Sequence, residues 1–498
     1  MKYILSLDQG TTSSRAILFD ESGQIVEVAQ QEFRQIYSHT GWVEHDPYEI
    51  LTSQLSSAVE ALGKAGARPR DVAGLGITNQ RETTIVWDRE SGRPIYNAIV
   101  WQDRRTAPLC SRLTAEGAEE AICSKTGLIV DPYFSGTKIA WLLDNVPGAR
   151  QQAEQGKLAF GTVDSWLIWN LTSGNRHVTD RTNASRTLLY NIVEDKWDAD
   201  LLKLLNVPAS MMPEVVWSSE KIGRVTTTLG LADIEIAGIA GDQQSALFGH
   251  LCTRAGDAKC TYGTGCFLLQ NIGDQFTLSS ERLLTTLTCS PARKLEYALE
   301  GSIFIGGAVV QWMRDNMKFI AQSPDIEALA RSAESSNGVY FVPAFTGLGA
   351  PWWDPNASGL IIGLQRGTQI GHIARAALES IAFQVADVLK AMDRGSGKPS
   401  THLRVDGGAA INDLLMQFQA DLLGIPLERP AVFEATALGA AYLAGLATGF
   451  WPNVETLARK RASDTVFRPA AGSPEMERRY AKWTDAVGRA RSWNTGLA

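Results

Sequence analysis

The first residues that could do chemistry lie in the stretch ILSLDQGTTSSRAILFD (4–20), where an apolar run ends at Asp8. A turn of small and hydroxyl residues then precedes a second apolar run: Gly10, Thr11, Thr12, Ser13 and Ser14. Ordinary turn chemistry is one interpretation, because Gly, Ser, Thr and Asp all favour turns. The alternative is a phosphate-binding turn, in which backbone N–H groups and hydroxyls surround an anion. Arg15 would then add a positive charge, and Asp8 would direct a metal ion.

A second stretch, AKCTYGTGCFLLQNIG (258–273), repeats this strand–turn–strand plan halfway along the chain. Its turn contains Gly263, Thr264 and Gly265, and glycine lets a backbone approach a phosphate without a Cβ atom in the way. The usual phosphate motifs, such as G-x-x-x-x-G-K-[ST], do not occur. The repeat predicts two similar domains, 1–249 and 250–498, each beginning with such a turn.

A strand in GIAGDQQSALFG (238–249) ends at Asp242, which is followed by the amides Gln243 and Gln244. Asp242 could simply cap the next helix, a role that Asp often has. Alternatively, it lies at the carboxyl end of a strand, where open α/β sheets bind ligands. A carboxylate there could accept a proton from an alcohol that attacks phosphorus.

Arg81 and Glu82 are adjacent in GITNQRETTIVWD (76–88), between two apolar runs. They could form a solvated pair in a turn, or an adjacent donor and acceptor for a polyol, whose hydroxyls offer both. Three aromatic residues follow apolar runs or a turn: Trp101, Tyr133 and Phe267. Each could be a core residue or part of an apolar wall against the carbon atoms of a hydroxylated substrate.

The stretch LRVDGGAAINDLLMQFQADLLG (403–424) predicts a strand, a Gly–Gly turn and a helix. It is either a plain strand–helix connection or a place where Gly407 and Gly408 admit a flat nucleoside. In the second case Asn412 would reach the nucleoside from the first turn of the helix.

The elements that must position these residues are strands alternating with amphipathic helices, which predicts an α/β protein. Strand-like runs occur at 73–79, 84–88 and 234–241, and helical periodicity at 48–66 and 371–392. The 498 residues are too many for one core, so two or more domains are expected.

The composition is that of an ordinary globular protein, with 44% apolar and 20% charged residues. The net charge of −7, without long runs, does not suggest nucleic-acid binding, and no apolar run is long enough to span a membrane. The start, MKYILSLDQG, leaves no room for a signal peptide, and the six cysteines suggest neither zinc nor disulfides. We therefore expect a cytoplasmic protein.

Taken together, these motifs resemble the FGGY family of carbohydrate kinases, in the order of that family from residue 3 to about residue 450. The matching stretches include LDQGTTSSRA, GITNQRETT, IVWQDRR, DPYFSGTK, TDRTNASRT, GIAGDQQSALFG, TYGTGCF and RVDGGA. The combination of NQRETT, GDQQ and TYGTGCF favours the glycerol-phosphorylating branch over the xylulose and gluconate branches. The resemblance implies two RNase H-like domains of the actin, Hsp70 and hexokinase superfamily, which flank a nucleotide cleft.

The resemblance also implies ATP-dependent phosphorylation of glycerol to sn-glycerol 3-phosphate, with Mg²⁺, and assembly as a homodimer or homotetramer. The implied ligands of the glycerol hydroxyls are Arg81, Glu82, Tyr133, Asp242 and Gln243, with Trp101 and Phe267 beside its carbon atoms. The implied nucleotide ligands are Thr11, Thr12, Ser13 and Arg15 at the β/γ-phosphates, and Thr264, Gly307, Gln311, Gly408 and Asn412 elsewhere. Asp242 would be the general base and a second candidate metal ligand, whereas Asp8 would direct Mg²⁺ largely through water.

Two departures from the family bear on regulation. Where some family members bind the inhibitor fructose 1,6-bisphosphate through an arginine, the stretch TTTLGLADIEIAG (226–238) has Asp233. An acid would repel a bisphosphate, so we expect weak or no inhibition. Other members are activated by phosphorylation of a histidine, and 186–198 contains none, so this regulation is not expected either.

Two other functions stay open at this point. One is a kinase of the same fold that acts on another polyol or sugar. The other is a non-catalytic, ATP-gated clamp, although such a protein would need neither Asp242 nor the Arg81–Glu82 pair.

Overall fold

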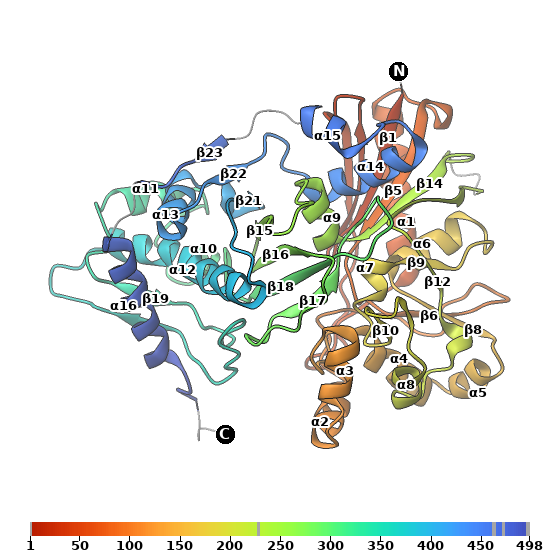
Figure 1. The fold of residues 1–498 in the computed structure, drawn as a ribbon, viewed down its shortest axis with the longest axis horizontal. Coiled ribbons are helices and arrows are strands. Elements are labelled where there is room, and N and C mark those ends of the chain that lie inside the picture. The colour runs from red at the N-terminus through yellow and green to blue at the C-terminus, as the bar shows by residue number, and fades with distance from the viewer. Residues whose placement is uncertain (1, 227–229, 461–464, 471–473, 495–498) are drawn as a thin grey trace.

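The computed structural model describes residues 2–226, 230–460, 465–470 and 474–494. It confirms the α/β class: two mixed sheets, each covered by helices, lie side by side along the longest axis of the molecule (Figure 1). None of the described helices is both long enough and apolar enough to cross a membrane.

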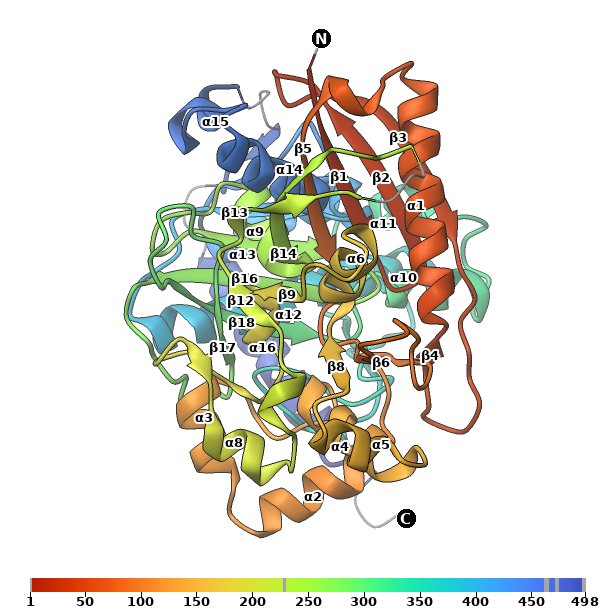
Figure 2. The ribbon, with the colours of Figure 1, turned by 90° about the vertical axis from the view of Figure 1, so that its right-hand side faces the viewer.

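The first sheet has six strands in the order β13-β14-β5-β1-β2-β3. Their bounds are β1 (Tyr3–Gln9), β2 (Ser13–Phe19), β3 (Ile25–Glu32), β5 (Val72–Asn79), β13 (Ser219–Arg224) and β14 (Glu235–Gly241). Strand β2 is antiparallel to both of its neighbours, β1 and β3, whereas β1, β5 and β14 run parallel to one another. Helices α1 (Pro47–Lys64) and α6 (Val163–Leu171) cover one face, where α1 lies along β2 and β3 (Figure 2).

The second sheet has seven strands in the order β17-β18-β16-β15-β21-β22-β23. Their bounds are β15 (Ala258–Tyr262), β16 (Cys266–Gly273), β17 (Leu284–Leu287), β18 (Tyr297–Ile303), β21 (Leu403–Asp406), β22 (Leu427–Arg429) and β23 (Thr465–Phe467). As in the first sheet, an antiparallel hairpin (β15–β16) is followed by a later strand (β21) parallel to its first strand. Both predicted hairpins are therefore confirmed. The main helices of this half are α12 (Ile370–Ser396), α13 (Asp413–Leu423) and α16 (Pro474–Ala490).

Shorter elements fill the connections. The remaining helices are α2 (Ala107–Ala115), α3 (Glu119–Thr126), α4 (Ser135–Asn145), α5 (Ala149–Glu154), α7 (Arg181–Ala184), α8 (Ala199–Leu204), α10 (Ala308–Asp315), α11 (Asp325–Arg331) and α15 (Val454–Lys460). The remaining strands are β4 (Glu44–His45), β6 (Ile85–Asp88), β7 (Ala98–Ile99), β8 (Leu158–Gly161), β9 (Val178–Asp180), β10 (Tyr190–Asn191), β11 (Lys196–Trp197), β12 (Glu214–Val216), β19 (Tyr340–Val342) and β20 (Leu360–Ile362).

Helix α14 (Ala435–Thr448) comes late in the chain but packs on the first sheet and on α9 (Asp242–Gly249) (Figure 1). Glycines allow this close approach. A Cβ atom on Gly76 of β5 would lie 2.2 Å from the carbonyl oxygen of Ala440, and one on Gly439 would lie 1.9 Å from that of Ser245. The second half of the chain thus contributes a helix to the first sheet, and the division at residue 249 stays a prediction.

Candidate functional site

The turn of the first hairpin is closed by a hydrogen bond from the Gly10 amide to the Ser13 carbonyl, at 2.9 Å. The Thr12 side chain is exposed there, and Thr11 and Ser13 are half-buried. Arg15 lies behind the turn and donates to Asp8 and, at 2.7 Å, to Oε2 of Glu434 at the start of α14. Arg15 is therefore held by two carboxylates. One of them, Glu434, was not among the candidate residues from the sequence.

The turn of the second hairpin meets the start of α10. Gly307 donates from its amide to the Gly263 carbonyl at 2.8 Å, and a Cβ atom on Gly265 would lie 2.4 Å from the Ile303 carbonyl oxygen. Only glycine fits there, because the backbones are already in contact.

Beside this turn is a cavity of about 390 Å³, within the size range of small-molecule sites. Five of its lining residues are those assigned to the nucleotide: Thr264, Gly307, Gln311, Gly408 and Asn412. The other lining residues include the apolar side chains of Val310, Ile326, Leu378, Ile411 and Leu415. The structure therefore brings the five residues together, and their role in binding a nucleotide stays a proposal.

The Gly–Gly turn has two different tasks. Gly407 has φ +87°, and a Cβ atom there would lie 2.6 Å from the Tyr262 carbonyl oxygen, whereas a Cβ atom on Gly408 would meet nothing within 4 Å. Gly407 is thus needed for the backbone path, and Gly408 leaves space at the cavity. Asn412 is the N-cap of α13 rather than a residue of its first turn: its Oδ1 accepts from the Leu415 amide at 2.8 Å.

Arg81 and Glu82 follow β5 and are both buried, so the interpretation as a solvated turn pair is wrong. Glu82 has φ +61°, an uncommon conformation for a residue with a side chain. Because the backbone is irregular here, successive side chains no longer point to opposite faces as they do along β5. Nε of Arg81 lies 3.3 Å from Oδ1 of Asp242, and its Nη2 lies 3.3 Å from the hydroxyl of Tyr133.

Asp242 is the first residue of α9, and the N-cap is Gly241. The interpretation of Asp242 as a helix cap is therefore wrong. Its side chain is 33% exposed, and Oδ1 accepts from the Gln243 amide at 2.7 Å. Burial raises the pKa of Asp242 above its ordinary value, although Arg81 and Lys259 act in the opposite direction. A carboxylate whose pKa is raised towards the working pH is suited to general base catalysis.

Two of the three predicted aromatic residues meet. The rings of Trp101 and Tyr133 pack edge to face with centroids 5.5 Å apart, and Nε1 of Trp101 donates to Oγ1 of Thr11 at 3.0 Å. Trp101 thus connects the residues expected to bind a polyol with the turn of the first hairpin. Phe267 lies on β16 of the second sheet, half-buried. Its pairing with Ser302 places it on the same face as Glu300, because alternate residues of a strand share a face.

Three charged residues of this cluster were not singled out from the sequence: Glu300, Arg186 and Lys259. Glu300 on β18 binds Arg81 through both carboxylate oxygens, and Arg186 binds both Glu82 and Glu300. Lys259 donates from Nζ to Oε1 of Gln243 at 2.5 Å. Gln244, named from the sequence only as the second amide after Asp242, accepts at Oε1 from Arg81 at 3.1 Å. One signal was available: Glu300 is a lone charge within an apolar strand, and such a residue is buried only when paired.

A Mg²⁺ ion fits the carboxylates near the two turns only in part-hydrated form. Among the described residues there is no group of three or more His, Cys, Asp or Glu side chains placed to hold a metal. Asp8 is 3% exposed and paired with Arg15, whereas the Asp242 side chain is 33% exposed. Mg²⁺ usually keeps several waters and takes one or two carboxylates plus substrate phosphates, so this donor set is compatible with it.

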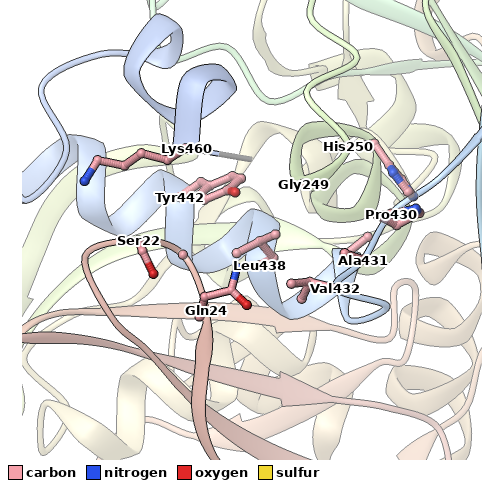
Figure 3. Close-up of a pocket in the computed structure, with 12 residues that line it drawn as sticks. Ser22, Gln24, Gly249, His250, Pro430, Ala431, Val432, Leu438, Tyr442 and Lys460 are labelled. Atoms are coloured by element: carbon pink, nitrogen blue, oxygen red, sulfur yellow. The ribbon is translucent and has the colours of Figure 1, made fainter. Parts of the chain in front are cut away.

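A second hollow lies between the β2–β3 turn and α14, lined by residues that include Gln24, His250, Leu438 and Tyr442 (Figure 3). Its volume of about 20 Å³ is close to that of one water molecule, so it cannot hold a substrate.

The stretch 226–238, where the sequence predicts weak or no inhibition by a bisphosphate, is only partly described, because residues 227–229 lie outside the described residues. Asp233 has φ +67°, and its carbonyl accepts from Arg224 at 2.8 Å. The acid predicted to repel a bisphosphate thus has an arginine beside its backbone.

Two related sheets, each beginning with a hairpin whose turn contains Gly and Thr, and an acid beside a cluster of buried polar residues are typical of kinases of the two-domain actin and hexokinase type. The chain belongs to the FGGY family of carbohydrate kinases: the model of the N-terminal domain of that family matches residues 3–249, and the model of the C-terminal domain matches residues 258–448. This confirms the resemblance inferred from the motifs.

The relatives identify the branch that the chain is similar to. It is 59% identical to a glycerol kinase of Koribacter versatilis and 57% identical to glycerol kinase 2 of Thermotoga maritima, in each case over 99% of both chains. Among solved structures it is similar to Plasmodium falciparum glycerol kinase with ADP, with a TM-score of 0.93, 38% identity and 98% of each chain covered. A xylulose kinase of Lactobacillus acidophilus, 24% identical with a TM-score of 0.87 over 100% of this chain and 98% of its own, shares the fold.

Proposed function

We propose that this chain transfers the γ-phosphoryl group of ATP to a terminal hydroxyl of glycerol, giving sn-glycerol 3-phosphate and ADP. The observation that carries the proposal is the hydrogen bond between Trp101 and Thr11, at 3.0 Å. Because Trp101 also packs on Tyr133, whose hydroxyl lies 3.3 Å from Nη2 of Arg81, the cluster of Arg81, Glu82 and Asp242 lies near the turn of the first hairpin. An alcohol held by that cluster would lie next to a phosphate held by that turn.

In this mechanism Asp242 accepts the proton of the attacking hydroxyl, a contribution typically of about 10²–10⁴ in rate. The other hydroxyls of glycerol would bind Arg81, Glu82, Tyr133 and Gln243, which offer donors and acceptors. Trp101 and Phe267 would lie against the carbon atoms, one from each half of the chain.

The two turns would hold the nucleotide from opposite sides. Thr11, Thr12, Ser13 and Arg15 would bind the β- and γ-phosphates, while Thr264, Gly307, Gln311, Gly408 and Asn412 would position the remainder in the cavity that they line. When bound, Mg²⁺ would neutralise phosphate charge, and Asp8, through water, and Asp242 would hold it. Phosphoryl transfer depends mainly on such positioning and neutralisation.

The experiment that tests the proposal is a coupled ADP-release assay with ATP and Mg²⁺ and a set of acceptors. We expect turnover with glycerol, and much lower kcat/KM with dihydroxyacetone, xylulose and gluconate. Negligible activity with glycerol but activity with another acceptor would favour a different kinase of the same fold. No turnover with any of them, together with ATP binding, would favour the non-catalytic clamp.

We further propose that the reaction takes place in the cytoplasm, where ATP is available, and that the active form is a homodimer or homotetramer. Light scattering coupled to size-exclusion chromatography, at the protein concentration used for the assay, tests the assembly. A monomer with full activity would contradict it.

A further inference from the structure

Glu300 forms a buried ion pair with Arg81 through both of its carboxylate oxygens, and this pair joins the two halves of the chain. Its Oε2 accepts from Nη1 of Arg81 at 2.6 Å, and its Oε1 accepts from Nη2 of Arg81 at 2.8 Å. Glu300 belongs to β18 of the second sheet, whereas Arg81 follows β5 of the first. Two parallel hydrogen bonds of this kind fix the plane of a guanidinium group as well as its position.

A second arginine extends the pair to Glu82. Arg186 donates from Nη2 to Oε1 of Glu300 at 3.1 Å, and from Nε to Oε1 of Glu82 at 2.6 Å. Arg186 follows the short helix α7 in the first half of the chain. Because Nε of Arg81 lies 3.8 Å from Oε1 of Glu82, the four side chains form a closed network of two positive and two negative charges, in which only Glu300 comes from the second half.

The network is fully withdrawn from solvent, since Glu300 and Arg186 are 0% exposed, Glu82 1% and Arg81 3%. Burial by itself would raise the pKa of Glu300, but Arg186 and Arg81 outweigh burial and lower that pKa to about 2. Glu300 is therefore charged at any working pH. Removing one charge from such a network leaves its partners buried and unpaired, which is costly.

The geometry also determines which atoms of Arg81 are left for other partners. Glu300 occupies one proton on each Nη atom, and this holds Nε 3.3 Å from Asp242 and Nη2 3.3 Å from the Tyr133 hydroxyl. Without the two hydrogen bonds to Glu300, the Arg81 guanidinium could rotate. Arg186, which Glu300 also holds, could then move away from Glu82.

We propose that Glu300 is a positioning residue for the polyol site: it orients Arg81 directly and Glu82 through Arg186, so that polyol binding requires the second sheet to be docked against the first. Glu300 acts without touching the substrate. This inference rests on the proposed function, because it takes the Arg81–Glu82 pair as the polyol ligands.

The test compares Glu300→Gln, Glu300→Asp and the control Glu379→Gln with the unaltered chain, by steady-state kinetics with glycerol and with ATP varied in turn. Glu379 is a matched control because it is also a buried carboxylate held by two arginines, Arg375 and Arg479. It lies on α12 and belongs to neither of the proposed ligand sets.

We expect Glu300→Gln to raise the KM for glycerol about ten-fold or more while the KM for ATP changes less than about two-fold, because misplacement by about 1 Å is enough for effects of this size. Glu379→Gln should lower the melting temperature about as much as Glu300→Gln does, but it should leave the KM for glycerol unchanged. Glu300→Asp keeps the charge but is one methylene too short to reach both nitrogen atoms, so its KM for glycerol should rise by about three-fold or more.

If Glu300→Gln does not fold, Glu300→Asp decides the question. An unchanged KM for glycerol in the variant that folds, or an equal rise of both KM values, overturns the inference. These results are distinct from a failure of the proposed function, in which the unaltered chain itself does not phosphorylate glycerol.

Discussion

The close packing of α14 on α9 predicts that a side chain at Gly439 destabilises the protein, and the size of this effect follows from the interatomic distances. Gly439 of α14 faces the Ser245 backbone of α9, and an added Cβ atom would lie 1.9 Å from the Ser245 carbonyl oxygen, where ordinary contact begins at 3.4 Å. Gly439→Ala therefore requires the two helices to separate by about 1.5 Å, the difference between these distances.

The cost of this separation can be weighed against a gain in helix propensity. Overpacking of a close contact typically costs about 1–3 kcal/mol, and a clash between backbone and Cβ lies at the upper end. Alanine is about 1 kcal/mol better than glycine within a helix. The net expectation is a loss of about 2 kcal/mol, or about 4–8 °C in melting temperature for a unit of 150–250 residues.

The control is Gly63→Ala in α1, another glycine within a helix, where an added Cβ atom meets nothing within 4 Å. It should gain about 0.5–1 kcal/mol, so the two variants shift the melting temperature in opposite directions. Because α9 begins at Asp242, Gly439→Ala should also lower kcat about ten-fold or more. A melting temperature within about 1 °C of the unaltered chain, measured by calorimetry, would refute the packing argument.

Four further predictions follow from the site and the core. Asp242→Asn should lower kcat by about 10²–10⁴ with glycerol and ATP binding retained in calorimetric titrations, and an unchanged kcat would remove the proposed base. Glu434→Gln should lower the KM for ATP by about two-fold or more, because Arg15 loses a carboxylate that competes with phosphates; an unchanged or higher KM would contradict this. Fructose 1,6-bisphosphate at millimolar concentration should inhibit weakly or not at all, because the carboxylate of Asp233 would repel it, and strong inhibition would contradict this expectation. Burial lowers the pKa of His177 to about 4, so the unfolded state binds its proton first and stability should fall as the pH drops from about 6.5 to 4. His177→Gln should reduce that fall in melting temperature, and an identical pH profile would exclude His177 as a cause.

Local patterns in the sequence were sufficient for the two hairpins and for several other strands and helices. The Gly/Thr turns predicted both hairpins because a turn depends on a few consecutive residues, and the periodicity predicted α1 and α12 to within a few residues. Motif order was enough for the family, which the family models confirm.

The sequence could not decide between alternatives that depend on burial. Asp242 as a helix cap and the Arg81–Glu82 pair as a solvated turn were both reasonable from local residues. Both fail in the structure, because Gly241 is the cap and the pair is buried. Burial is set by segments distant in sequence, here β18 and α7, which no local pattern places beside residue 81.

The residue types and spacing by themselves thus determined two hairpins, an acid after a strand and the family of the chain. Only the tertiary structure decided how these parts are held: Glu300 and Arg186 lie 219 and 105 positions beyond Arg81 yet complete one buried network with it and Glu82. The physical reason is that an ion pair depends on distance in space, and a single sequence carries no record of which buried charges compensate one another.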